Sequence, residues 1–255
     1  MLFRSEALRA EGAKVIGFDV MFGEPGQGDG ELASAAGPDT VFAIDESLIE
    51  TPQASSLIRT EPLPEFTAFG AQAGVASVHM DGDGVLRQMP SYPDSLPRMI
   101  ARVSGAKPAE PDNSRPRLIQ YFGPANSYPR VSYYQALEPR KYLPPGYFKG
   151  KRVIIGYSLQ ATPDVAAGAT DAFETPYSAL TNALTPGVEV QATILDNLIN
   201  GLSIGTVPFW LGFIAMLAGG AVATLISGGL KPLLRVSDLV LALIGCIALS
   251  WLMMR

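Results

Sequence analysis

The sequence has few of the residues on which metal and thiol chemistry depend. It contains one histidine and one cysteine in 255 residues. A structural zinc site takes four ligands, mostly histidine and cysteine, so this pair cannot complete one. A disulfide needs two cysteines, so the chain can form none internally. We therefore expect no bound metal and no cofactor.

Charged residues are also scarce, at 17% of the chain against about 25% in typical soluble domains. Residues 206–230 form a run of 25 residues without one ionisable side chain. A helix of this length crosses a hydrocarbon core about 30 Å thick. Residues 236–254 form a second apolar stretch with one charge, Asp238, near its start. The sequence predicts a transmembrane helix in each stretch, and a buried core helix is the alternative.

The basic residues between these stretches predict an orientation. Lys231 and Arg235 lie in the connection 231–235, and Lys and Arg are enriched on the cytoplasmic side of membrane helices. This places the connection in the cytoplasm and residues 1–205, the head, outside it. The head begins with neither a signal peptide nor an apolar span. We expect a further span upstream; the alternative is a cytoplasmic head for which the charge rule misleads.

The head is acidic. Residues 206–255 hold three of the 19 Lys and Arg residues and one of the 24 Asp and Glu residues, which leaves 16 basic and 23 acidic residues and a net charge of −7. Proteins that bind nucleic acid present a basic patch to the phosphates. We therefore expect no nucleic-acid partner.

Short apolar runs alternate with amphipathic segments along the head, as in α/β domains. The buried strands are predicted over 14–22, 40–47, 117–123 and 151–158. A short helix between the first two strands completes a βαβ unit, which requires parallel pairing. The sequence predicts an α/β fold with a mostly parallel sheet covered by helices, followed by the transmembrane helices.

Two further segments complete this fold prediction. Residues 74–80 and 84–92 flank an Asp-Gly-Asp-Gly turn, which predicts an antiparallel hairpin. Residues 50–69 are rich in Pro, Thr and Ser and predict a loop that leads to a helical turn.

The last amphipathic segment of the head, residues 187–201, predicts a helix that ends at Gly201. Its apolar residues share one face at helical spacing: Val188, Ala192, Leu195 and Ile199. Only residues 202–205 separate this helix from the first predicted span.

No catalytic motif is complete. Residues 156–160 read Gly-Tyr-Ser-Leu-Gln and lack the second glycine of a nucleophile elbow. The glycine-rich residues 23–30 do not fit the dinucleotide fingerprint. The acidic turn at residues 81–84 lacks the later ligands of a calcium loop. We therefore expect no enzymatic activity in this chain.

The fold nevertheless predicts where a ligand would bind. In open parallel sheets, ligands lie beyond the carboxyl ends of the strands, where this chain places Asp19, Asp45, Tyr157 and Ser158. A carboxylate within an apolar strand, such as Asp19, needs a partner, and Arg87 is a candidate. These five residues form the candidate ligand-binding site, and capping of helices and loops is the alternative role.

Five strings in order resemble one family: KVIGFDVMFGEP, GVASVHMDGDGVLRQMP, FKGKRVIIG, DAFETP and GVEVQATILDNLING, followed by the apolar stretches. Together they resemble the type-2 CHASE domain over residues 7–204. This domain is the extracytoplasmic sensor of bacterial adenylate cyclases, histidine kinases and serine/threonine kinases. The chain departs from the family at Gln191, where the family often has His, and at residues 96–101, which usually contain Ser-Phe-Ala-Leu.

The resemblance implies a sensory protein of the inner (cell) membrane. The expected organisation is a periplasmic or extracellular sensor over 1–205, a span over 206–230, a cytoplasmic connection over 231–235 and a span over 236–254. The sensor would detect an unknown small-molecule or envelope signal, form a homodimer and act on a cytoplasmic cyclase or kinase output that this chain lacks. The alternatives are a membrane-tethered α/β enzyme and a structural dimerisation module.

Overall fold

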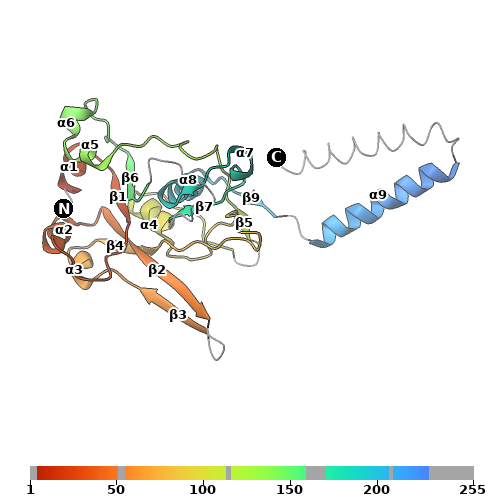
Figure 1. Cartoon of the computed structure of the whole chain (residues 1–255), viewed down its shortest axis with the longest axis horizontal. Helices are drawn as coiled ribbons and strands as arrows, with labels where there is room; N and C mark the ends of the chain where they lie inside the picture. The colour runs from red at the N-terminus through yellow and green to blue at the C-terminus, as the bar shows by residue number, and fades with distance from the viewer. Residues whose placement is uncertain (1–4, 51–54, 113–115, 159–170, 207–208, 230–255) are drawn as a thin grey trace. The chain divides into compact units, whose positions relative to one another are not determined.

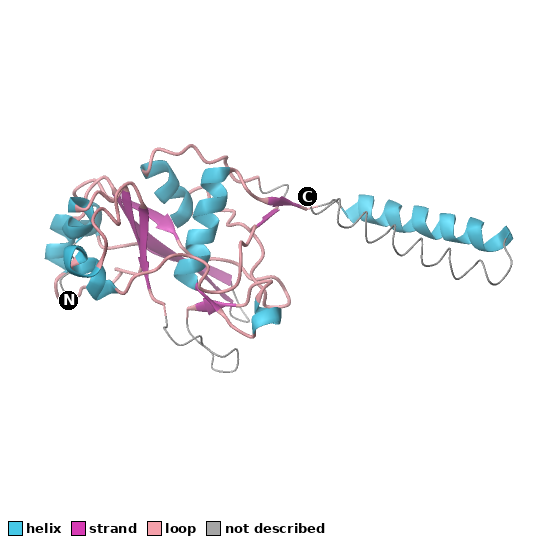
Figure 2. Ribbon diagram, turned by 90° about the horizontal axis from the view of Figure 1, so that it is seen from above, coloured by secondary structure: helices cyan, strands magenta, loops and turns pink. Residues whose placement is uncertain are grey.

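The computed structural model describes residues 5–50, 55–112, 116–158, 171–206 and 209–229. The chain divides into two compact units, residues 1–203 and residues 204–255. The first unit is an α/β domain with helices on both sides of its strands (Figures 1 and 2).

The central sheet of the first unit is mixed but mostly parallel. β1 (Val15–Asp19) pairs in parallel with β2 (Thr40–Glu50) and with β6 (Arg152–Gly156), and β4 (Gln72–Val75) pairs in parallel with β2. β3 (Ser55–Thr60) pairs antiparallel with the second half of β2. The order is β3-β2-β1-β6, with β4 also on β2. The predicted parallel βαβ unit is confirmed.

The helices of this unit are mostly short: α1 (Ser5–Ala10), α2 (Asp29–Ala35), α3 (Pro64–Thr67), α4 (Leu96–Val103), α5 (Tyr133–Leu137), α6 (Pro139–Tyr142), α7 (Ser178–Thr181) and α8 (Gly187–Asn200). Two-residue strands also occur: β5 (Arg117–Leu118), β7 (Ala172–Phe173) and β8 (Thr185–Pro186), with β9 (Ile204–Gly205) in the second unit. α8 ends at Gly201, whose φ of 65° is left-handed, as the sequence predicts.

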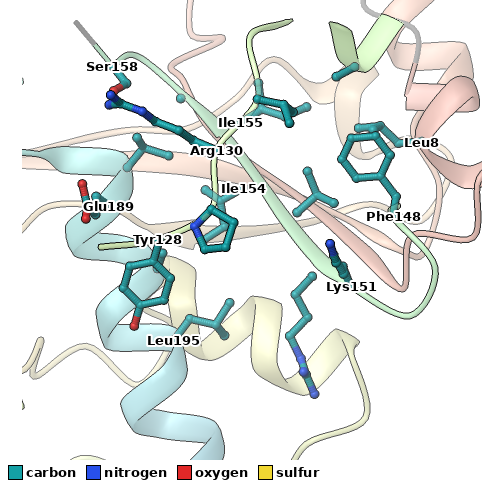
Figure 3. Close-up of a pocket in the computed structure, with 18 of the residues that line it drawn as sticks. Leu8, Tyr128, Arg130, Phe148, Lys151, Ile154, Ile155, Ser158, Glu189 and Leu195 are labelled. Atoms are coloured by element: carbon teal, nitrogen blue, oxygen red, sulfur yellow. The ribbon is translucent and has the colours of Figure 1, made fainter. Parts of the chain in front are cut away.

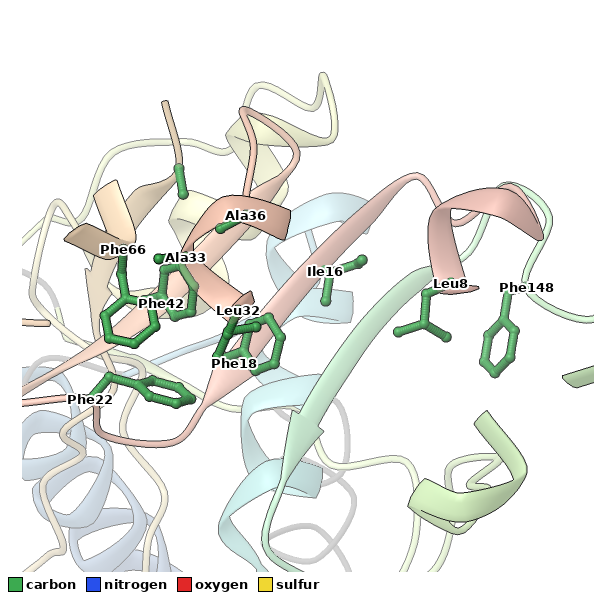
Figure 4. Packing of buried hydrophobic residues seen from close by; sticks show 11 residues of the cluster. Leu8, Ile16, Phe18, Phe22, Leu32, Ala33, Ala36, Phe42, Phe66 and Phe148 are labelled. Atoms are coloured by element: carbon green, nitrogen blue, oxygen red, sulfur yellow. The ribbon is translucent and has the colours of Figure 1, made fainter. Parts of the chain in front are cut away.

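The sheet has an apolar core on each face. On one face, Phe18 and Phe42 stack with their ring centroids 5.1 Å apart, and Phe22 and Phe66 pack beside them. Leu32 of α2 covers these rings (Figure 4). The residues of the opposite core, beneath α4 and α8, include Val15, Val41, Leu96, Ile100 and Leu195. Burial on both faces explains why β1 and the first part of β2, residues 41–44, are apolar.

A glycine in β4 allows α4 to approach the sheet closely. A Cβ atom built on Gly74 would lie 2.9 Å from the Cα of Leu96, a separation that real Cβ atoms do not tolerate. This position therefore requires glycine because α4 lies directly against the strand.

The hairpin prediction was wrong in its location. β3 lies within residues 50–69, which were expected to form a loop, and with β2 it forms the antiparallel hairpin. Residues 84–92 instead make isolated bridges to distant segments, from Val85 to Glu174 and from Gln88 to Leu118. The acidic turn itself is present, since the Gly84 amide donates to the Asp81 carbonyl. The strand predicted over 117–123 has only two residues, β5.

The second unit contains α9 (Phe209–Gly229), a helix of 21 residues that lies within the stretch 206–230. In the described part of the chain, no helix reaches the length and apolarity that a bilayer crossing demands. The stretch 236–254 lies outside the described residues.

Candidate functional site

The five predicted site residues do not gather in one place. Asp19 ends β1 and pairs in register with Gly156 of β6, so Tyr157 and Ser158 follow at the same edge of the sheet. Asp45 lies farther along, in the part of β2 that pairs with β3. Its carboxylate accepts hydrogen bonds from the hydroxyls of two serines, Ser47 and Ser77.

Arg87 is not the partner of Asp19, which corrects the sequence prediction. Its guanidinium donates to Asp81 at 2.9 Å and to Asp83 at 2.8 Å, both in the acidic turn. These hydrogen bonds lower the pKa of Asp83 to about 2. Asp83 and Asp81 are only four and six residues from Arg87 in the chain. Arg87 therefore forms ion pairs with these neighbours and not with the distant Asp19.

Asp19 is half-buried, and its carboxylate accepts no hydrogen bond from any residue that the structure describes. Burial raises the pKa of Asp19 to about 7, and the negative charge of Asp171 contributes to this shift. Burial also raises the pKa of Asp171. Asp171 lies next to the first residue of α8, because its backbone carbonyl accepts a hydrogen bond from the amide of Gly187. Two carboxyl groups that resist ionisation therefore lie near the first turn of α8.

A cavity of about 600 Å³ lies along β6, on the edge that does not face β1. Among the described residues, β6 pairs only with β1, so this edge is open. We call this space the β6 cavity (Figure 3). Pockets that hold small molecules have volumes of about 300–1,000 Å³, so the β6 cavity is large enough for such a ligand.

β6 and α8 form two sides of the cavity, and both contribute apolar side chains. The wall residues from β6 and α8 include Val153, Ile154, Ile155, Val188, Ala192, Leu195 and Ile199. Leu8 of α1 and Phe148 close one end. The four residues of α8 are the apolar face that the sequence predicts, but only Leu195 is fully buried and the other three are half-buried against the cavity.

Another part of the wall, residues 128–131, belongs to a loop that is bound to α8 by two carboxylates. Both oxygens of Glu189 accept backbone N–H groups, from Asn126 at 2.8 Å and from Ser127 at 2.7 Å. The Tyr128 hydroxyl donates to Asp196 at 3.3 Å. Burial, with a further contribution from Asp196, raises the pKa of Tyr128 to about 12. These bonds join residues more than 60 positions apart, so α8 cannot move without affecting the loop that closes the cavity.

The rim of the cavity carries charge of both signs. Arg130 and Lys151 supply positive charge, and Glu189 supplies negative charge (Figure 3). Asp196 also lines the cavity and adds a second negative charge. Lys151 also lies 3.7 Å from the ring centroid of Tyr147. An apolar interior with a charged rim suits a small amphipathic molecule.

Of the five predicted residues, only Ser158 lines the β6 cavity. Tyr157, its neighbour, is 58% exposed and points elsewhere. Sequence reasoning missed the polar residues of the loop and of α8 because they lie far apart in the chain. The residues it missed are Tyr128, Arg130, Glu189 and Asp196.

A metal centre does not arise from the described side chains, since no three His, Cys, Asp or Glu residues among them gather closely enough to hold an ion.

Comparison with known proteins gives one match. The family model for the CHASE2 domain matches residues 5–228. No curated protein and no solved structure matches the chain.

Proposed function

The chain belongs to the CHASE2 domain family, and we propose on this basis that it detects a ligand in the β6 cavity and relays its presence along α8. CHASE2 domains are extracytoplasmic sensory domains that are not catalytic in themselves and are usually coupled to cyclase or kinase outputs. The proposed ligand is a small molecule or an envelope signal, and the proposed receiver is a cytoplasmic cyclase or kinase.

The proposal includes a membrane anchor. Residues 206–230 and 236–254 form its two spans, and residues 231–235 form its cytoplasmic connection, so that residues 1–205 sense the exterior. Support comes from the 25 residues without an ionisable side chain and from the position of Lys231 and Arg235.

One observation supports the proposed transmission of the signal along α8. The residues of α8 that line the cavity run from Val188 to Ile199, so a ligand would contact the helix along about three turns. Residues 201–205 alone separate α8 from the stretch 206–230. A ligand shifts a two-state equilibrium only through a difference in its affinity for the two states. Here the helix that contacts the ligand is also the element that continues toward the output.

Filling the cavity from α8 tests this proposal. We expect Ala192→Trp to occupy part of the β6 cavity in place of a ligand and to shift the equilibrium between the two states of α8, because the added ring contacts α8 and the cavity wall differently in each state. The test uses a fusion protein in which residues 1–255 follow an N-terminal span and precede a third span and a reporter cyclase. The basal cyclase activity of this fusion should change by at least about fivefold, which is the lower end of the range for allosteric coupling.

Leu180→Trp is the matched control, because Leu180 is 81% exposed on α7 and does not line the cavity. It should leave cyclase activity at the wild-type level. Equal activity for wild type and Ala192→Trp, at equal amounts of folded protein in the membrane, would count against the proposal.

A further inference from the structure

A second cavity, of about 430 Å³, lies at the C-terminal end of α8 and shares no lining residue with the β6 cavity. We call it the Arg98 cavity. Arg98 comes from α4 and Arg117 from β5. Leu198 belongs to the last turns of α8, and residues 201–203 follow that helix along the wall. The volume is within the range of pockets that hold small molecules.

Arg98 is a buried cation whose hydrogen bonds are incomplete. The residue is 3% exposed. Its Nη1 atom donates to the Ala109 carbonyl, but no described residue accepts a hydrogen bond from the buried Nε atom or from Nη2. The edge formed by Nε and Nη2 therefore has no partner in the part of the chain that the structure describes. A carboxylate binds such an edge with two parallel hydrogen bonds.

The surroundings of Arg98 within the chain do not neutralise its charge. Arg98 is the third residue of α4, and the helix dipole disfavours a positive charge in the first turn. Burial lowers the pKa of Arg98, and the negative charge of Glu110 offsets this shift only in part. The Glu110 carboxylate instead pairs with Arg102 at 2.5 Å. A buried charge is normally paired, so Arg98 would gain from an anion in the cavity.

A second arginine and an apolar wall complete the cavity. Arg117 is exposed on β5, and it forms no ion pair with any carboxylate among the described residues. Met89, Leu198 and Leu202 supply apolar side chains to the wall. Pockets with an apolar lining and a few polar groups bind organic molecules and orient them through those groups. The two arginines select for negative charge on such a molecule.

The acidic residues of the wall limit how much negative charge the ligand can bear. Glu110 and Asp112 both line the cavity, so a doubly charged phosphate would meet more repulsion than a singly charged carboxylate. We propose that the Arg98 cavity binds a small organic carboxylate, with the carboxylate on the guanidinium of Arg98 and the apolar body against Met89 and Leu198. This binding site is separate from the β6 cavity and does not depend on the function proposed for it.

Saturation-transfer NMR of the purified full chain in detergent tests this site, with benzoate as the probe. We expect saturable binding of benzoate at neutral pH. Benzamide has nearly the same shape without the charge, so it should bind at least about fivefold more weakly because it loses charge-assisted hydrogen bonds. Detergent micelles without protein give the background.

Three substitutions assign the binding to the Arg98 cavity. Arg98→Gln should weaken benzoate binding at least about tenfold, because a hydrogen-bonded charge is lost. Arg98→Lys keeps the charge without the planar edge and should bind with intermediate affinity. Arg117→Gln changes an exposed side chain, so it leaves the fold intact and should weaken binding at least about twofold. This variant keeps the test decisive if Arg98→Gln does not fold.

Two variants with the same change serve as controls. Arg140→Gln removes an arginine that is 87% exposed on α6, and Arg130→Gln removes a cation from the β6 cavity. Both should bind benzoate as the wild type does. A loss with Arg130→Gln but not with Arg98→Gln would place the anion in the β6 cavity and overturn the proposal.

Three other results would also overturn it. They are the absence of saturable benzoate binding to the wild type, unchanged binding in the folded Arg98 and Arg117 variants, and tighter binding of phenyl phosphate than of benzoate.

Discussion

Asp19→Asn will raise the melting temperature of the protein at pH 8 and leave it nearly unchanged at pH 4. The pKa of Asp19 is about 7 in the folded chain against an ordinary 3.8. The folded state therefore holds the proton more tightly than the unfolded state. The contribution of this protonation to the free energy of unfolding is fully present below pH 3.8, and it is lost as the pH rises through 7. Asparagine resembles the protonated carboxyl and does not suffer this loss.

The size of the effect follows from the shift. One pKa unit corresponds to about 1.4 kcal/mol, and partial exposure of the residue reduces the total, so we expect a gain of about 2 kcal/mol at pH 8. For a domain of this size, that gain raises the melting temperature by about 4–8 °C. Circular dichroism of the full chain in detergent, recorded at several pH values, gives the measurement.

Asp45→Asn provides the control for this experiment. The Asp45 carboxylate accepts two serine hydroxyls, so its replacement removes good hydrogen bonds and should not stabilise the protein at any pH. The explanation is refuted if Asp19→Asn gives the same change at pH 4 as at pH 8, or if it destabilises the protein at pH 8.

Gly156→Ala will destabilise the protein because α8 lies directly on β6 at this position. A Cβ atom on Gly156 would lie 2.8 Å from both the Cβ and the Cγ2 of Val188. The Val188 side chain is short and branched, so the first turn of α8 has to move. Forced displacements of this kind cost about 1–3 kcal/mol, which lowers the melting temperature by about 2–12 °C. In the reporter cyclase fusion, the same shift should change basal activity.

Gly82→Ala tests whether any new methyl group has this effect. No atom lies within 4 Å of a Cβ built on Gly82. The free energy of unfolding of the Gly82→Ala variant should therefore stay within about 0.5 kcal/mol of wild type. Equal melting temperatures for the two alanine variants would show that α8 does not need the close contact with β6.

The sequence predicts most of the elements that pack against both faces of the sheet. β1, the first part of β2 and β6 are short apolar runs, and α8 has an amphipathic pattern with a terminal glycine, so local periodicity is sufficient to find them. β3 was missed because its residues, Ser55 through Thr60, are almost all exposed and do not alternate between buried and exposed positions. The strand is stabilised by its pairing with β2, which the local sequence does not reveal.

The candidate site was less predictable. The rule for open sheets selects Ser158, which lines the cavity, but it does not predict the cavity as a whole, which lies along β6 rather than beyond the strand ends. Its polar residues come from a loop near Tyr128 and from α8, more than 60 residues apart. Such long-range contacts depend on tertiary packing, and a single sequence carries no local signal for them.

The most direct test of the relay is cyclase activity of the reporter fusion with the short connection between α8 and residues 206–230 made flexible. A flexible Gly-Ser insertion after Ser203 is combined with Ala192→Trp. If α8 transmits the state of the β6 cavity mechanically, the insertion should bring the activity of Ala192→Trp to that of the insertion alone. If Ala192→Trp alters cyclase activity equally with and without the insertion, the signal does not travel through α8 and the proposed relay is wrong.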